Sequence, residues 1–226
     1  MIVLPPHEAL ADRLARRLAV PLPGHTAHAQ MAPFPNRTDA SVISVEHNAG
    51  RPAATLVLLF PGAAGAGTSL VLTLRQPTLR AHSGQVALPG GRLDPGETPE
   101  DAARREAWEE VGVAPGAPRV LGRLTPLYIP PSGYSVWPVV ATVAARPAFR
   151  VQADEVAALI EVPLAELLAP EARRSGPRRL AAGAPAEVPF FALGGHEVWG
   201  ATAMMLAEFC AVVTEACRTP GGVASR

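Results

Sequence analysis

The spacing of apolar residues along the chain predicts which segments are helices and which are strands. Ala53–Phe60 is a continuous apolar run, typical of a buried strand, and Ser69–Arg75 alternates as its pairing partner should. Residues 7–19 repeat leucine at helical spacing, which predicts an amphipathic helix. Thr202–Cys217 is a longer and more apolar helical segment. Helices and strands thus alternate along one chain, as in the mixed α/β (α+β) fold class.

The remaining segments complete one predicted domain. Further elements are expected as a weak strand at Ser41–Glu46, strands at Gln85–Leu88, Arg119–Tyr128, Ser135–Ala144 and Ala157–Val162, a short helix at Leu164–Leu168, and a final hairpin of Val188–Leu193 with Glu197–Trp199. Residues 20–38 and 170–186 are rich in proline or in Ala, Pro, Arg and Gly, so we expect a surface loop and a flexible insertion. We therefore expect an N-terminal helix and Pro-rich loop at 1–38, a domain at 39–218 and a frayed tail at 219–226.

Composition narrows the functional class only slightly. The 226 residues carry a formal net charge of zero, which gives no electrostatic case for nucleic acid or a membrane as the main partner. The chain has two cysteines, and its first residues lack the basic and then apolar stretch of a signal peptide. Both features are consistent with a cytoplasmic protein. The apolar last helix is open to two interpretations, a homodimer interface or a helix packed in the core.

A capped helix is predicted at Pro99–Val111. Thr98 can cap its first turn, Pro99 suits the first helical position, and Gly112 can end it. On this helix Glu106, Glu109 and Glu110 fall at i, i+3 and i+4 and therefore share a face.

Three carboxylates on one face repel each other, and a cation can relieve that repulsion. Oxygen ligands of this kind suit Mg²⁺ or Mn²⁺. A solvated acidic helix face is the alternative for such a spacing taken alone. Arg105 and Glu97 can pair across the preceding loop, and Gly91 lets that loop approach closely.

The surrounding segment, GRLDPGETPEDAARREAWEEVGV at 91–113, resembles the Nudix box at every fixed position. Those positions are Gly91, Glu97, Arg105, Glu106, Glu109, Glu110 and Gly112. The resemblance implies an α/β/α sandwich with a mixed sheet between helices, and metal-dependent hydrolysis of a nucleoside diphosphate linkage. It further implies that Glu106 and Glu110 ligate the metal directly, that Glu109 shares the cluster, that the Gly91 carbonyl also coordinates, and that Glu97 and Arg105 support them.

The preceding segment, LTLRQPTLRAHSGQVALPGG at 72–91, resembles the signature of coenzyme A diphosphatases. The positions in register are Leu72, Thr73, Arg75, Arg80, Gly84, Pro89, Gly90 and Gly91. Gln76 stands where that family has Ser or Ala, and Leu88 where it has Phe. The resemblance implies cleavage of coenzyme A, or its thioesters, to 3′,5′-ADP and 4′-phosphopantetheine or its acyl form.

Basic residues of this segment are candidates for binding the phosphates of the substrate. Arg75 and Arg80 can form forked, charge-assisted bonds with phosphates, or one or both can pair with carboxylates of the box. Gln85 is a candidate for the wall of the same cleft, and His82 is expected to be a polar loop residue.

The catalytic base of this superfamily varies in position. Our candidate is Glu155, just before a predicted strand; an ordinary polar turn is the equal alternative. Gln76 and Leu88 also keep open a Nudix pyrophosphatase for ADP-ribose, a dinucleoside polyphosphate or a nucleoside triphosphate. The other class to consider is a non-catalytic nucleotide-binding module, which would have no need of the complete set of carboxylates.

Overall fold

A computed structural model describes residues 2–33, 42–63, 67–77, 84–179 and 185–218. The helices are α1 (His7–Leu18), α2 (His25–His28), α3 (Pro99–Val111), α4 (Leu164–Leu168) and α5 (Gly200–Cys217), with 3₁₀ turns η1 (Ala29–Met31) and η3 (Pro170–Ala172). The strands are β1 (Arg51–Pro61), β2 (Thr68–Arg75), β3 (Val86–Ala87), β4 (Gly90–Arg92), β5 (Arg119–Arg123), β6 (Leu127–Ile129), β7 (Tyr134–Thr142), β8 (Val156–Pro163), β9 (Arg173–Arg179), β10 (Pro185–Leu193) and β11 (His196–Trp199).

An eight-stranded mixed sheet organises the molecule. Its main path runs β3-β2-β1-β7-β5, while β4 pairs with β1, β6 with β7 and β8 with β2. β1 and β7 are parallel over nine residue pairs, and the other pairings in this sheet are antiparallel. The predicted pairing of the first two long strands is confirmed, but it covers only the three pairs from Leu59↔Leu70 to Pro61↔Thr68.

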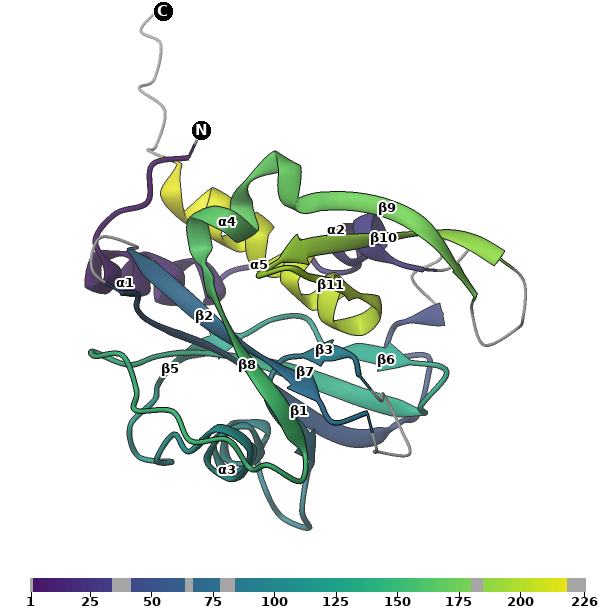
Figure 1. Ribbon diagram of the computed structural model, residues 1–226, viewed down its shortest axis with the longest axis horizontal. Coiled ribbons are helices and arrows are strands. Elements are labelled where there is room, and N and C mark those ends of the chain that lie inside the picture. Colours follow the sequence, from purple (N-terminus) through teal and green to yellow (C-terminus); the bar gives the residue numbers. More distant parts are fainter. Residues whose placement is uncertain (1, 34–41, 64–66, 78–83, 180–184, 219–226) are drawn as a thin grey trace, which may run out of the picture.

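The central strand β1 is buried on both faces, which is why its sequence is a continuous apolar run. Leu56, Leu58 and Phe60 pack with the apolar side of α3, whereas Val57 and Leu59 belong to the core under α1 and α5. Figure 1 shows α3 on one side of the sheet and α5 on the other. The structure therefore confirms the predicted sandwich, with a mixed sheet between helices.

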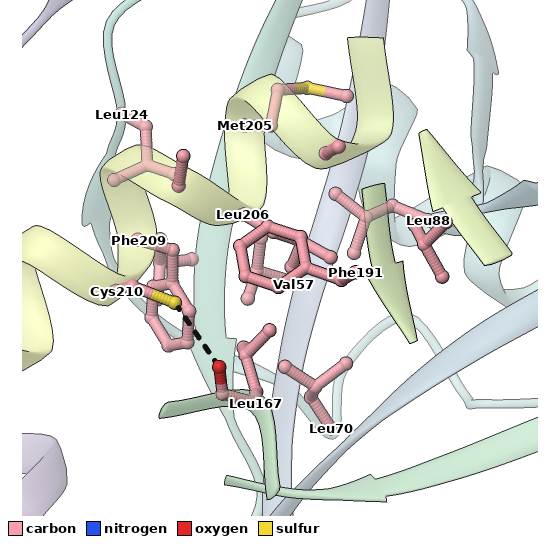
Figure 2. Close-up of a cluster of buried hydrophobic side chains, with 14 of the residues drawn as sticks. Val57, Leu70, Leu88, Leu124, Leu167, Phe191, Met205, Leu206, Phe209 and Cys210 are labelled. Carbon is pink, nitrogen blue, oxygen red and sulfur yellow. Dashed lines mark hydrogen bonds between the residues drawn. The ribbon is translucent and has the colours of Figure 1, made fainter. Parts of the chain in front are cut away.

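Helix α5 fills the larger core. Met205, Leu206, Phe209 and Cys210 are buried there against Phe191 and the sheet (Figure 2). By length and composition α5 is apolar enough to cross a membrane, with a mean hydropathy of 1.3 over 18 residues, but 61% of that window is buried in the protein. Packing in the core thus accounts for the apolar composition that had also suggested a dimer interface.

Three predictions of secondary structure are wrong. Much of the supposed flexible insertion forms β9, which pairs with β10 in a separate antiparallel sheet with β11; residues 180–184 lie outside the described residues. Residues 25–31 of the supposed loop form α2 and η1. The weak strand is not a strand at residues 42–46, where the chain makes turns. The tail at 219–226 lies outside the described residues.

Candidate active site

Helix α3 begins and ends where its capping residues predict. The Thr98 hydroxyl accepts a hydrogen bond from the Asp101 amide at 3.2 Å, and Pro99 is the first helical residue. At the other end Gly112 has φ +75°, in the left-handed region that favours glycine. These two caps fix the register of the helix and hence the positions of its three carboxylates.

The three glutamates of α3 lie in different environments. Glu110 is only 3% exposed, Glu106 is largely buried, and Glu109 is half exposed. Burial raises the pKa of Glu110 to about 7, against the opposing charge of Arg75. Burial also raises the pKa of Glu106. The negative charges of neighbouring glutamates act in the same direction on both groups, so the protein holds these carboxylates at a cost in free energy.

Arg105 clamps the loop before α3 to the helix. Its Nε and Nη2 donate to the two oxygens of Glu97 at 2.8 and 2.9 Å, and Nη2 also donates to the Arg92 carbonyl at 2.8 Å. Its Nη1 donates to Glu106 at 2.9 Å and to Glu109 at 3.3 Å. The hydrogen bond from Arg105 holds the pKa of Glu97 at about 2, and the same pairing raises the pKa of Arg105.

Two glycines bring the backbone of the loop against the carboxylates. Strand β4 pairs with β1, so that Gly90 lies opposite Thr55 and Gly91 opposite Ala54. The Gly90 amide donates to Glu110 at 3.2 Å. A Cβ atom on Gly91 would overlap the carboxylate of Glu106, and one on Gly90 would overlap the backbone of β1. A side chain at Gly90 would therefore have to displace the backbone of β1, and one at Gly91 would have to displace the Glu106 carboxylate.

The donor set fits a hard divalent cation, although it is not a ready-made cage. Within the described residues, no group of three or more His, Cys, Asp or Glu side chains is arranged to hold a metal ion as it stands. Arg105 contacts Glu106 and Glu109, and Arg75 contacts Glu110 at 3.4 Å. Each of these arginine contacts engages one oxygen of its carboxylate, Oε1 of Glu106 and Glu110 and Oε2 of Glu109. The Glu106 carboxylate fills the space that a side chain at position 91 would take, so it lies directly against the Gly91 backbone.

Glu155 lies beside the carboxylates of α3. Its negative charge contributes to the raised pKa values of both Glu106 and Glu110. The Gln76 amide donates to the Glu155 carbonyl at 2.9 Å, and the Gln76 side chain donates to the Ala153 carbonyl at 2.8 Å. The end of β2 therefore anchors the turn that carries Glu155.

The predicted phosphate-binding residues are only partly described. Arg75 pairs with Glu110, so the structure brings it together with a box carboxylate. Its Nε is buried and has no hydrogen-bond partner in the described part of the chain. Gln85 is half-buried beside it, and its carbonyl accepts from the Arg75 amide at 3.0 Å. Arg80 and His82 lie outside the described residues.

Two recesses are lined in part by the carboxylates of α3. The first, of about 630 Å³, is lined mainly by the 92–97 loop with Arg105 and Glu106. The second, of about 750 Å³, is lined by Glu109, Glu155, Gly112 and Ala148, and also by Trp108, Arg150, Val151 and Gln152. Sequence reasoning missed Trp108. It could have been noticed because a tryptophan stands between Glu106 and Glu109 in the sequence, on a helix face otherwise occupied by charged residues.

The chain has clear relatives. Residues 50–182 match the family model of the NUDIX domain. Over 101 residues the chain is 46% identical to a protein described as "Uncharacterized Nudix hydrolase NudL" from Yersinia enterocolitica, covering 44% of this chain and 51% of the relative. A protein of the same description from Yersinia pestis matches equally well over 50% of its length. The match thus spans about half the length of these curated relatives.

Solved structures also match. A Nudix hydrolase from M. smegmatis, RenU, is 30% identical, with coverage of 50% of this chain and 70% of that chain and a TM-score of 0.43. The MutT protein of Methanosarcina mazei Go1 is 19% identical, with coverage of 72% and 95% and a TM-score of 0.46.

Proposed function

Because the chain belongs to the Nudix family, we propose that it is a metal-dependent pyrophosphohydrolase whose substrate is coenzyme A or its thioesters. The single observation that carries hydrolysis is the arrangement of Glu106, Glu109 and Glu110 on α3 against the Gly90-Gly91 loop. Two of these carboxylates are kept in a largely buried setting that raises their pKa values, which is the expected state of ligands awaiting a cation.

Glu106 and Glu110 would hold Mg²⁺ or Mn²⁺, with Glu109 sharing the cluster and the Gly91 carbonyl as a further ligand. When bound, the metal would neutralise the charge of the diphosphate and lower the pKa of a bound water. Arg105 and Glu97 keep the loop and the helix in register. Glu155, on a turn tied to Gln76, is our candidate for the base that takes the proton of the attacking water.

The proposal of coenzyme A rests on the motif upstream of the box, and the two departures from that motif fall on structural positions. Leu88 is 2% exposed and packs in the core (Figure 2). The Gln76 side chain donates a hydrogen bond to the Ala153 carbonyl. Each side chain is thus engaged by the protein itself in this conformation. Arg75 and Arg80 remain the proposed phosphate-binding residues, with Gln85 beside them.

A second candidate, hydrolysis of another nucleoside diphosphate derivative, is favoured by one observation. Arg75 is paired with Glu110 through Nη1 at 3.4 Å, so in this conformation part of its guanidinium is engaged by a box carboxylate and not by the additional phosphate that distinguishes coenzyme A. ADP-ribose, dinucleoside polyphosphates and nucleoside triphosphates are the alternatives to be compared directly.

A substrate screen tests these proposals. Purified protein with Mg²⁺ or Mn²⁺ is offered coenzyme A, acetyl-coenzyme A, ADP-ribose, diadenosine tetraphosphate and ATP, and the products are separated by chromatography. We expect 3′,5′-ADP and 4′-phosphopantetheine from coenzyme A, with turnover lost in Glu106→Gln and Glu110→Gln. Higher kcat/KM on another substrate would support the second candidate. No turnover together with tight nucleotide binding would indicate a binding module.

The proposed compartment is the cytoplasm. Cys210 and Cys217 are free thiols, and burial raises the pKa of Cys210 to about 11. A buried thiol of this kind is unreactive and needs no oxidising environment.

A further inference from the structure

The recess between α3 and residues 148–155 exposes apolar surface next to the proposed catalytic carboxylates. Trp108 is 52% exposed and Val151 is 45% exposed, and both line this recess together with Glu109 and Glu155. An indole gains free energy when its faces are covered, and an uncovered one beside a catalytic centre is suited to a planar ligand.

Backbone hydrogen bonds hold the two walls of the recess together. The Arg150 amide donates to the Val111 carbonyl and the Gln152 amide donates to the Glu110 carbonyl, each at 3.0 Å. These bonds satisfy carbonyls at the C-terminal end of α3 that would otherwise have no partner. A Cβ atom on Gly112 would lie 3.0 Å from the Cβ of Arg150, so the glycine allows the close approach. The recess is therefore preformed.

Polar groups at the edge of the recess complement its apolar floor. Arg150 and Gln152 are exposed at its rim and carry N–H donors. In the described residues, no carboxylate lies within ion-pair distance of the Arg150 guanidinium. A stacking surface with donors at its edge matches a heteroaromatic base, which has π faces and ring-nitrogen acceptors, better than it matches a flexible alkyl-amide chain.

We propose that this recess is the base subsite, where the adenine of the substrate stacks on Trp108 and its edge is met by Arg150 and Gln152. This inference rests on the proposed function, since it assumes that the substrate is an adenine nucleotide. The base would then lie on the side of α3 bounded by Glu109 and Glu155, with the diphosphate at the carboxylates. Trp108 acts as a specificity-determining residue that touches substrate and takes no part in the chemical step.

Binding of AMP and of ribose 5-phosphate tests the subsite without any turnover. AMP has the base but no anhydride bond to cleave, and ribose 5-phosphate lacks the base. The full chain and its variants Trp108→Phe, Trp108→Leu and Trp108→Ala are compared by calorimetry, and AMP quenching of tryptophan fluorescence is followed in parallel. Trp199→Phe is the matched control, because Trp199 stacks on Arg178 in the small sheet, at 4.8 Å.

We expect AMP to quench the fluorescence of the wild type and of Trp199→Phe but not of Trp108→Phe, whose affinity stays near that of the wild type. Trp108→Leu and Trp108→Ala should bind AMP roughly 10- to 100-fold more weakly, as for the loss of one base–aromatic stack. Ribose 5-phosphate should bind all variants alike.

Absence of AMP binding to the wild type would overturn the subsite, as would an unchanged AMP affinity in Trp108→Ala or an equal loss for both ligands. Turnover of coenzyme A combined with any of these results leaves the proposed function intact and removes only the subsite. Conversely, Trp108-dependent AMP binding without turnover supports the subsite and contradicts the proposed function.

Discussion

The side-chain amide of Gln76 donates a hydrogen bond of 2.8 Å to the carbonyl oxygen of Ala153. This contact joins the end of β2 to the turn before β8. Because Glu155 follows two residues later, and its carbonyl accepts from the Gln76 backbone amide, one residue fixes the turn at two points. The position at which this chain departs from the motif it resembles is thereby linked to the candidate catalytic base.

Replacing Gln76 by alanine should lower kcat without a matching rise in KM. The side-chain bond contributes about 1 kcal/mol, so a loosened Glu155 should reduce kcat roughly 5-fold on the best substrate of the screen. Gln30→Ala is the control, because that side chain accepts from Arg173 at 2.8 Å in a different part of the protein. A raised KM with unchanged kcat would instead indicate that Gln76 contacts the substrate.

Glu110→Gln should stabilise the metal-free protein at alkaline pH. The folded pKa of Glu110 is about 7, above its ordinary value of 4.5. Between these values the folded state binds more protons than the unfolded state, so the free energy of unfolding of the wild type falls as pH rises from 4.5 to 7. Glutamine lacks this ionisation, and the gain in the free energy of unfolding at pH 8 should be on the order of 3 kcal/mol.

Urea unfolding at pH 5 and pH 8 in the presence of a chelator measures this difference. The exposed carboxylate of Glu171 provides a control, and Glu171→Gln should show no comparable gain. Equal destabilisation by Glu110→Gln at both pH values would contradict the prediction. Saturating Mg²⁺ should reverse the order, since only the wild type retains the full set of proposed ligands.

Arg105→Lys should weaken the binding of Mn²⁺ by 10-fold or more, a magnitude typical of residues that orient metal ligands. A lysine ammonium cannot donate to both oxygens of Glu97 and also reach the Arg92 carbonyl. Titration of Mn²⁺ followed by electron paramagnetic resonance gives the affinity. Arg104→Lys, on the same helix, removes only a 3.3 Å bond to the Pro118 carbonyl and should leave Mn²⁺ binding intact; similar losses in both variants would point to a general effect on α3.

Glu208→Gln should destabilise the fold by about 2–4 kcal/mol while leaving kcat per folded molecule unchanged. Glu208 is fully buried and accepts from the Gly24 amide, from the amide and hydroxyl of Thr125, and from His28 Nε2, at 2.6 to 3.0 Å. Burial by itself would raise the pKa of Glu208, but the hydrogen bonds from His28 and Thr125 outweigh it, and the pKa is lowered. Its contribution is therefore complete above pH 4.5 and is lost as pH falls through the folded pKa.

Thermal and urea unfolding at pH 7 and pH 4 test this prediction. The difference in the free energy of unfolding between the wild type and Glu208→Gln should be smaller at pH 4 than at pH 7. Glu215→Gln is the control, because Glu215 pairs with Arg17 at the surface and exposed pairs contribute at most about 1 kcal/mol. A Glu208→Gln protein as stable as the wild type would show that the buried network contributes nothing.

The helix of the box was predictable in its bounds because local chemistry determines them. Thr98, Pro99 and Gly112 cap or begin it by contacts with their neighbours in sequence, and helical spacing alone places the three carboxylates together. The main strands were predictable for a similar reason, since their apolar runs reflect burial on one or both faces.

The small sheet was not predictable because its pairing is not local. Strand β9 contains four arginines, a proline and a glycine, so it lacks the alternation of apolar and polar residues that indicates a strand. It forms a strand because it pairs with β10. Likewise, the sequence left Arg75 between two roles. The choice depends on how far the end of β2 lies from Glu110, a distance that neither segment encodes by itself. Trp108 was missed because exposure of an aromatic residue depends on what packs above it.

The buried pair of His28 and Glu208 has a consequence for synthesis of the protein. The two residues are 180 positions apart, and the face of the sheet that α5 covers stays open until the ribosome has made the last helix. Until then Gly24, His28 and Thr125 have no carboxylate to bind, and the apolar face beneath is uncovered. A nascent chain can pair β1 with β2 and dock α3 early, but completion of the larger core must await release of α5. Chaperone dependence should therefore be greatest for chains arrested just before Gly200.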